Sequence, residues 1–146
     1  MNINIKKLYD DAVIPTHGTE DSAGYDLYAR LEEGSISINP GESVMIKFGI
    51  ALEIPKGYFG GIFARSGMAA KRNLRPANCT AVIDSDYRGE LMVPLYNDSK
   101  VVQVIENGDR VAQIVIMPYL NVTFNETDNL SESSRDQGGF GSTGTK

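Results

Sequence analysis

The stretch VMIKFGIALEIP, residues 44–55, carries the clearest structural pattern in the chain. Its large apolar residues fall on every second position: Ile46, Phe48, Ile50, Leu52 and Ile54. A period of two is typical of a β-strand that buries one of its faces. We therefore expect an extended strand here, with these side chains in the hydrophobic core.

Shorter alternating runs occur elsewhere, in SISI (35–38), LMVPLYN (91–97), KVVQVI (100–105) and RVAQIVIM (110–117). The turn-forming sequences NPGE, PKGY, YRGE and ENGD lie between them. Many short strands with frequent turns predict an all-β fold, a jelly-roll barrel or sandwich. One short helix is expected at SGMAAKRN (66–73), where Met, Ala and Lys favour helix.

Length and composition limit the function classes. A chain of 146 residues with 41% hydrophobic residues fits one folded domain, which we place at residues 1–125. Residues 126–146 contain only Leu130 and Phe140 as large apolar residues, so we expect a flexible C-terminal tail. A net charge of −5 argues against nucleic-acid binding over a broad basic face.

The cellular setting follows from what the sequence lacks. No apolar run approaches a membrane span, and the N-terminus has no secretory h-region, so we expect a cytoplasmic protein that does not bind membranes. The single cysteine, Cys79, excludes an internal disulfide and is expected to be a small packed residue. Any metal should therefore bind oxygen ligands, because His17 is the only histidine.

Two polar clusters lie in the first half of the chain. AGYDLYA (23–29) places Asp26 among apolar residues, either as a functional carboxylate or as a strand-end residue that accepts backbone hydrogen bonds. ARSGMAAK (64–71) places Arg65 and Ser66 directly before the expected helix. That arrangement suits anion binding, and the alternative is a Ser N-cap beside a surface Arg.

Two further clusters follow. In NCTAVIDSDYRGEL (78–91) an apolar strand leads into Asp84, Asp86 and Tyr87. In an extended segment both acids would project to one side and the tyrosine to the other, although acids in turns are also common for local reasons. In NGDRVAQIVI (107–116) the polar Gln113 interrupts an apolar strand and should need a hydrogen-bond partner.

The tail sequence RDQGGFGSTGTK (135–146) contains the spacing G-x-G-x-x-G. Such a loop normally opens a helix that holds a pyrophosphate, but only Thr145 and Lys146 follow it here. A Gly-rich strap with an aromatic and hydroxyl side chains suits closure over a ligand that has a ring and phosphates.

AGYDLYA, RSGMAAK, AVIDSDYRGE, NGDRVAQ and RDQGGFGSTG, in this order, resemble the five motifs of the trimeric dUTPase family. The resemblance implies a jelly-roll homotrimer with active sites shared between subunits and a tail that closes over bound nucleotide. It implies Mg²⁺-dependent hydrolysis of dUTP to dUMP and pyrophosphate, which limits uracil in DNA and supplies dUMP for dTMP synthesis.

The resemblance also implies a role for each matching residue. Asp84 would activate the attacking water. Asp26 would contact the Mg²⁺ ion through water, and the triphosphate would supply most of the metal ligands. The expected phosphate contacts are Arg65, Ser66, Gly67, Gln113, Arg135, Ser142 and Thr143. The expected uracil and deoxyribose contacts are Asn78, Val82, Ile83, Tyr87, Phe140 and Gly141.

The chain departs from the family pattern at two positions where glycine is usual. Ala81 would strain the uracil hairpin if its backbone required a positive φ. Asp136 would place a negative charge near the outermost phosphate. Either departure would weaken binding or be silent.

Two other functions remain open on sequence alone. One is a dCTP deaminase, because that family resembles dUTPases in architecture. The other is a non-catalytic trimer that binds nucleotide or a partner protein. The Asp-Ser-Asp-Tyr-Arg-Gly sequence and the Phe-containing tail favour dUTP hydrolysis over deamination. The presence of Asp84, Asp26 and Arg135 together counts against the non-catalytic trimer.

Overall fold

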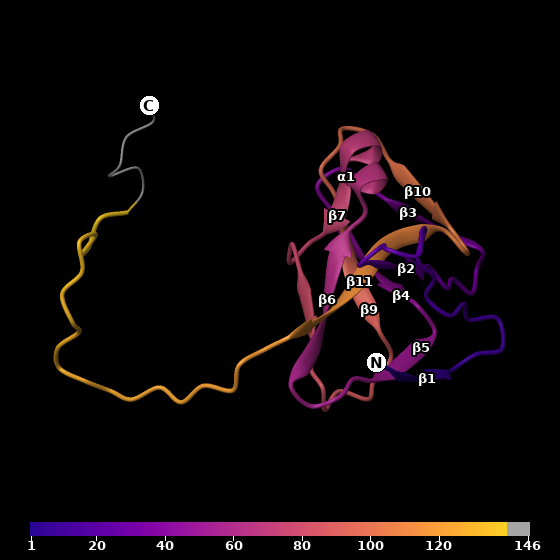
Figure 1. The fold of residues 1–146 in the computed structure, drawn as a ribbon. Coiled ribbons are helices and arrows are strands. Elements are labelled where there is room, and N and C mark those ends of the chain that lie inside the picture. The colour runs from indigo at the N-terminus through magenta and orange to yellow at the C-terminus, as the bar shows by residue number, and fades with distance from the viewer. Residues whose placement is uncertain (140–146) are drawn as a thin grey trace.

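The structure is a computed structural model that describes residues 1–139. These residues form antiparallel strands and one short helix (Figure 1), which confirms the predicted all-β class. The elements are β1 (Asn4–Lys7), β2 (Tyr25–Tyr28), β3 (Ser35–Ile38), β4 (Ser43–Lys47), β5 (Ile50–Glu53), β6 (Tyr58–Ala64), α1 (Ser66–Arg72), β7 (Leu74–Pro76), β8 (Ala81–Ile83), β9 (Met92–Asn97), β10 (Gln103–Glu106) and β11 (Arg110–Pro118).

The strands pair in an order that differs from their order in the sequence. A four-stranded sheet runs β2-β11-β6-β8, and a three-stranded sheet runs β4-β9-β7. The pairs β1-β5 and β10-β3 extend the body. Crossing connections between antiparallel sheets are the arrangement of a jelly roll.

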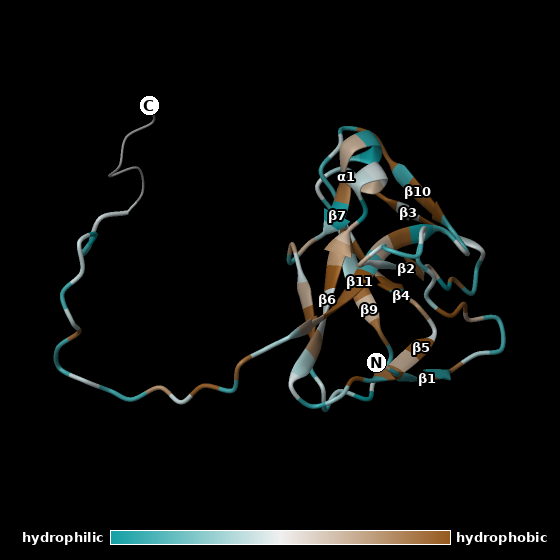
Figure 2. Cartoon of the chain, viewed as in Figure 1, coloured by the Kyte–Doolittle hydropathy of each residue, from teal (hydrophilic) through white to brown (hydrophobic). Residues whose placement is uncertain are grey.

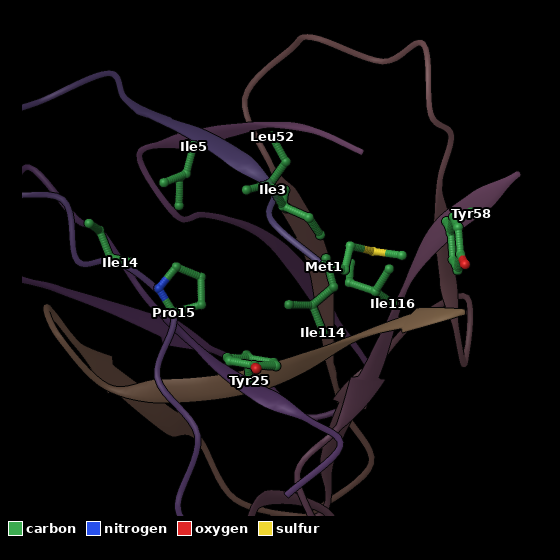
Figure 3. A pocket seen from close by; sticks show the side chains of 10 residues that line it. All are labelled: Met1, Ile3, Ile5, Ile14, Pro15, Tyr25, Leu52, Tyr58, Ile114 and Ile116. Carbon is green, nitrogen blue, oxygen red and sulfur yellow. The ribbon is translucent and has the colours of Figure 1, made fainter. Parts of the chain in front are cut away.

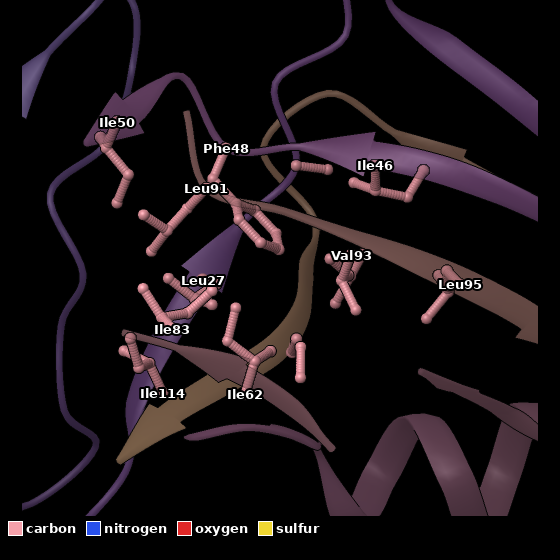
Figure 4. Packing of buried hydrophobic residues seen from close by; sticks show 14 of the residues in the cluster. Leu27, Ile46, Phe48, Ile50, Ile62, Ile83, Leu91, Val93, Leu95 and Ile114 are labelled. Carbon is pink, nitrogen blue, oxygen red and sulfur yellow. The ribbon is translucent and has the colours of Figure 1, made fainter. Parts of the chain in front are cut away.

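The core lies between the four-stranded and three-stranded sheets. In Figure 4, side chains of Ile46 and Val93 from one sheet face Leu27, Ile62 and Ile114 from the other. All five are buried, because each strand directs alternate side chains inward. The inward-facing half of the sequence pattern therefore builds one continuous core.

The stretch 44–55 contributes to this core from two sheets, the three-stranded sheet through β4 and the β1-β5 pair through β5. Every large apolar residue of the alternating pattern is buried, as predicted. The prediction of one strand is wrong, because β4 ends at Lys47 and β5 begins at Ile50 in a different sheet. Gly49, with φ +68°, makes the bend between them.

Backbone hydrogen bonds fix this bend to the segment that follows the Asp84 turn. The Phe48 amide donates to the Leu91 carbonyl at 3.1 Å, and the Leu91 amide donates to the Ile50 carbonyl at 2.8 Å. The Gly49 amide donates to Oε1 of Glu90 at 3.1 Å. The bend therefore supports one end of the Asp84 turn as well as the core.

Most other predicted elements are confirmed, at 35–38, 91–97 and 110–117 and in the helix. The strand expected at 100–105 begins only at Gln103. Asn97 explains the late start, since its side chain donates to the Val101 carbonyl and accepts from the Ser99 amide, which holds this segment in a turn.

After β11 the chain leaves the body (Figure 1), and residues 119–139 contain no helix or strand. This segment is largely hydrophilic with short hydrophobic parts (Figure 2). Within the described residues, no helix has the length and apolar character needed to cross a bilayer.

Gly49→Ala should destabilise the fold more than Gly57→Ala. Both glycines have positive φ, which costs a residue with a side chain about 1–2 kcal/mol. At Gly49 a Cβ would also lie 2.9 Å from Cβ of Ala12, whereas at Gly57 nothing lies within 4 Å. Overpacking adds about 1–3 kcal/mol. Thermal unfolding of the two variants measures the difference, and equal Tm values would contradict this account of the bend.

Candidate active site

Asp26 on β2 binds two arginines that come from other strands. Nε of Arg65, directly after β6, lies 2.6 Å from Oδ1 of Asp26, and its Nη2 lies 3.3 Å from Oδ2. Nη1 of Arg110, the first residue of β11, lies 3.1 Å from the same Oδ2. Nη1 of Arg65 also donates to the Arg110 carbonyl at 3.2 Å.

Asp26, Arg65 and Arg110 form a triad with a net positive charge, and its arginines are more exposed than its carboxylate. The Asp26 side chain is 13% exposed, whereas those of Arg65 and Arg110 are 27% and 52% exposed. Two guanidinium groups compensate one carboxylate, so the exposed side of the triad carries excess positive charge that suits phosphate oxygens. The interpretation of Asp26 as a strand-end residue with backbone partners is therefore wrong.

Arg65 also precedes the helix α1. It is the N-cap residue, with extended backbone at φ −79° and ψ 138°, and Ser66 and Gly67 are exposed at the start of the helix. The alternative of a Ser N-cap beside a free surface Arg is therefore wrong. The structure brings Arg65, Ser66 and Gly67 together at the end of β6.

Gln113 lies beside the triad, because it pairs with Asp26 across β2 and β11. Its side-chain Nε2 donates to the Ala64 carbonyl at 2.9 Å, which confirms that the amide finds a partner. Its Oε1 lies over Gly24, where a Cβ would collide with it. Gly24 therefore leaves the space that the Gln113 amide occupies.

The Asp84 segment closes into a turn after β8. The Tyr87 amide donates to the Asp84 carbonyl at 3.2 Å, so the extended conformation considered for residues 84–87 is wrong. The Tyr87 hydroxyl donates to the Glu90 carbonyl at 3.0 Å, and its ring lies over Gly89.

The exposed Asp84 carboxylate lies between two hollows. One, of about 120 Å³, is lined by Val82, Ile83, Asp84, Tyr87, Glu90 and Met92. The other, of about 600 Å³, is lined by Lys56, Gly57, Asp84, Ser85, Asp86, Tyr119 and Asn121. The structure thus places Asp84 with Val82, Ile83 and Tyr87 around a small cavity.

The turn between β7 and β8 contains the expected uracil contact Asn78, which is exposed. Cys79 is exposed and has φ +60°, so its prediction as a packed residue is wrong. Ala81 lies within β8, and the described residues with positive φ do not include it. The expected strain at Ala81 is therefore absent, and Cys79 adopts the left-handed conformation instead.

The Asp26 triad and Asp84 lie far apart in one chain. Asp26 is on β2 and Asp84 follows β8, at opposite edges of the four-stranded sheet. Three strand spacings of about 4.8 Å separate these edges by roughly 14 Å. The two clusters are also separated along the strand direction. Ile83, the residue before Asp84, pairs with Gly60 of β6, and Gly60 precedes Arg65 by about five residues, or roughly 16 Å of strand.

The tail residues lie apart from both clusters. Arg135 donates from Nε to the Gly138 carbonyl at 2.7 Å, within a local turn away from the body (Figure 1). Asp136, where glycine is common in the family, has φ +47°. The expected contacts Phe140, Gly141, Ser142 and Thr143 lie outside the described residues.

A separate apolar hollow of about 500 Å³ opens between β1, β5, β6 and β11 (Figure 3). Its lining residues are Met1, Ile3, Ile5, Ile14, Pro15, Tyr25, Leu52, Tyr58, Ile114 and Ile116. None of their side chains carries a charge at neutral pH, so these side chains do not suit a triphosphate.

Comparison with known proteins identifies the family and the fold. The family model for dUTPase matches residues 10–144. The chain belongs to the dUTPase family. A deoxyuridine 5'-triphosphate nucleotidohydrolase of Hydrogenobaculum sp. is 43% identical over 100% of both chains. One from Anaplasma marginale is 46% identical and covers 90% of this chain and 89% of its own.

Solved dUTPases have the same jelly-roll architecture. The G164S mutant of the Staphylococcus bacteriophage 80alpha dUTPase, with dUpNHpp, superposes with a TM-score of 0.89 at 27% identity, and the match covers 98% of each chain. A mutant dUTPase from phage phi11 of S. aureus, with a structural Mg(II) ion, superposes with a TM-score of 0.80 at 24% identity. The latter covers 90% of this chain and 100% of its own.

Three residues of the candidate site were not predicted from the sequence. Arg110 stands in the fourth motif, but only the strand pairing shows that it binds Asp26. Gly24 stands in the first motif, where its glycine could have indicated a close approach. Glu90 gave no signal, since its role is a long-range bond to Gly49.

Gly24→Ala should raise KM for dUTP by about tenfold or more with little change in Tm. The added Cβ displaces the Gln113 amide, but Gly24 is only half-buried and its Cβ would meet no other side chain within 4 Å among its three nearest atoms. A misplaced binding group of this kind can cost about 10²-fold. Steady-state kinetics measures the effect, with Gly18→Ala as control because nothing lies within 4 Å of a Cβ there. Unchanged KM would mean that Gln113 does not contact substrate.

Proposed function

We propose that this dUTPase hydrolyses dUTP to dUMP and pyrophosphate in a homotrimer whose active sites combine residues of different subunits. Membership of the dUTPase family supports the reaction, and the nucleotidohydrolases that match over the full chain support the substrate. The bound dUpNHpp in the phage 80alpha enzyme supports the same substrate class.

The separation of the two clusters carries the shared-site proposal. Asp84 and the Asp26 triad lie at opposite edges of one hydrogen-bonded sheet. A water activated by Asp84 must attack a phosphorus atom of the same triphosphate that Arg65 holds. A second copy of the chain resolves this conflict, because its triad can approach the Asp84 turn of the first copy.

Exposed apolar surface supports the assembly. The hollow lined by Ile3, Ile5 and Ile116 is open in one chain. In the segment after β11, Leu120 and Phe124 are 86% and 94% exposed. Contiguous apolar surface of this kind is typical of an interface, and association of copies would bury it.

The triad supplies the phosphate contacts. Arg65 and Arg110 hold excess positive charge over Asp26, and Gln113 adds an amide beside it. Ser66 and Gly67 are exposed next to Arg65, where a hydroxyl and backbone amides can donate to phosphate oxygens. In the full site, Arg135, Ser142 and Thr143 of a tail reach the outer phosphates.

Asp84 acts as the general base. Its exposed carboxylate accepts a proton from water, and the water oxygen attacks the α-phosphorus. The bond from the α-phosphorus to the bridging oxygen breaks, and pyrophosphate leaves with the bonding electron pair. The cavity of about 120 Å³ beside Asp84 positions the nucleoside for this attack.

The nucleoside lies against the β7–β8 turn. Asn78 and the backbone at Val82 and Ile83 contact the uracil edge, and the Tyr87 ring packs under the deoxyribose. The tail residues Phe140 and Gly141 cover the other face of the base. A closely fitting slot excludes a 5-methyl group by overpacking.

Mg²⁺ fits the oxygen donors of this site. Among residues 1–139, no group of three or more His, Cys, Asp or Glu could hold a metal, so most ligands must come from phosphates and water. Both Asp26 oxygens already accept guanidinium hydrogen bonds, which suits contact through water. When bound, Mg²⁺ neutralises phosphate charge.

The test measures pyrophosphate release with Mg²⁺ from dUTP beside dCTP, dTTP and UTP, with ammonia release from dCTP followed in parallel. We expect release from dUTP alone. Asp84→Asn should lower kcat by about 10²–10⁴-fold, the usual contribution of a general base, with little change in KM. Asp86→Asn is the matched control, because Asp86 is exposed in the same turn.

Three outcomes would contradict the proposal. Ammonia release from dCTP would indicate a deaminase. Tight dUTP binding without turnover would indicate a binding protein. Equal turnover by wild type and Asp84→Asn would exclude Asp84 as the base.

A further inference from the structure

Arg75 on β7 makes an unusually complete set of contacts for a surface residue. Its Nε lies 2.6 Å from Oδ2 of Asp98, and its Nη2 lies 3.3 Å from Oδ1. Its guanidinium carbon lies 5.0 Å from the ring centroid of Tyr96, the residue that pairs with Arg75 across β7 and β9. The guanidinium is therefore oriented by both a carboxylate and an aromatic face.

The remaining donor points along the chain toward the uracil-binding turn. Nη1 of Arg75 donates to the Pro76 carbonyl at 3.3 Å and to the Ala77 carbonyl at 3.4 Å. The Ala77 amide donates to the Pro94 carbonyl of β9 at 2.7 Å. The point where the chain leaves β7 is thus held by Arg75 from one side and by β9 from the other.

Asp98, the carboxylate partner of Arg75, is itself held by a backbone hydrogen bond to the end of α1. Its amide donates to the carbonyl of Asn73 at 2.9 Å, and Asn73 is the C-cap of α1 with φ +51°. The hydrogen bonds with Asp98 raise the pKa of the Arg75 guanidinium above its ordinary value. Asp98 therefore links the turn to the end of the helix.

The turn beyond Ala77 is held mainly by local contacts. The Cys79 amide donates to the Pro76 carbonyl at 3.0 Å, and the Thr80 amide donates to the Asn78 carbonyl at 2.6 Å. Asn78 and Cys79 are exposed, and Cys79 has φ +60°. The position of the Asn78 amide and of the following backbone therefore depends on how the base of the turn is fixed.

We propose that the Arg75–Asp98 pair is a positioning element that sets pyrimidine specificity by fixing the β7–β8 turn. Arg75 holds the Pro76 and Ala77 carbonyls, which keeps the turn close against the 5-position of the base. Neither residue touches substrate. This inference rests on the proposed function, because it assigns the same turn to uracil recognition.

Arg30 provides a matched control outside the site. Its Nε lies 3.2 Å from Oδ1 of Asp11, and its guanidinium carbon lies 3.6 Å over the Tyr9 ring. Its Nη1 also lies 3.1 Å from Oε1 of Glu32, so Arg30 combines carboxylate and aromatic contacts as Arg75 does, but it does not contact the β7–β8 turn. Arg30→Met therefore measures how far the loss of a paired guanidinium outside the site changes Tm and kcat/KM.

The experiment compares wild type with Arg75→Met, Asp98→Asn, Arg75→Lys and Arg30→Met, using kcat/KM for dUTP and for dTTP and Tm for each. We expect Arg75→Met and Asp98→Asn to reduce the preference for dUTP over dTTP at least tenfold, through KM for dUTP, with kcat within twofold. Arg75→Lys should recover only part of the preference, since an ammonium cannot contact Asp98 and two carbonyls in the same geometry. Arg30→Met should leave the preference unchanged.

An unchanged preference in Arg75→Met, or the same change in Arg30→Met, would overturn the positioning role. If wild type releases no pyrophosphate from dUTP, the proposed function fails separately. Calorimetry then measures the affinities for dUMP and dTMP and tests the positioning role of the Arg75–Asp98 pair. This role is overturned if Arg75→Met has the same preference between the two nucleotides as Arg30→Met, or if wild type binds neither nucleotide.

Discussion

The strand order β2-β11-β6-β8 is the constraint on which the chemistry of this dUTPase depends. It places Asp26 at one edge of a sheet and the Asp84 turn beyond the other. Ladder hydrogen bonds hold the strands at fixed spacing, so no side-chain rotation brings both carboxylates to one triphosphate. The proposed site therefore needs the Asp26 cluster of one copy and the Asp84 turn of another.

Electrostatics prepare each half for a different task. Asp26 is largely buried and orients Arg65 and Arg110 in the free chain, so the proposed binding of phosphates would need little reorganisation of these side chains. Asp84 is exposed beside a small cavity and is free to accept a proton. The buried carboxylate of Asp26 binds two cations, whereas the exposed carboxylate of Asp84 is the one to which we assign proton transfer.

The sequence predicted local features well and long-range ones poorly. Alternation located the buried residues of 44–55, because side-chain direction follows from the strand period alone. It could not reveal the bend at Gly49, since both arms keep the same inward pattern while they join different sheets. Likewise, the motifs named Asp26 and Arg65, but the partnership with Arg110 arises only from strand pairing.

Co-expression of two inactive chains, Asp84→Asn and Arg65→Gln, tests the shared site most directly. Different affinity tags on the two chains allow purification of mixed trimers only. In a cyclic trimer that contains both chains, one of three sites receives an intact Asp84 from one subunit and an intact Arg65 from its neighbour. The account predicts recovery of about one third of wild-type dUTP hydrolysis. Mixed trimers as inactive as their parents would contradict it.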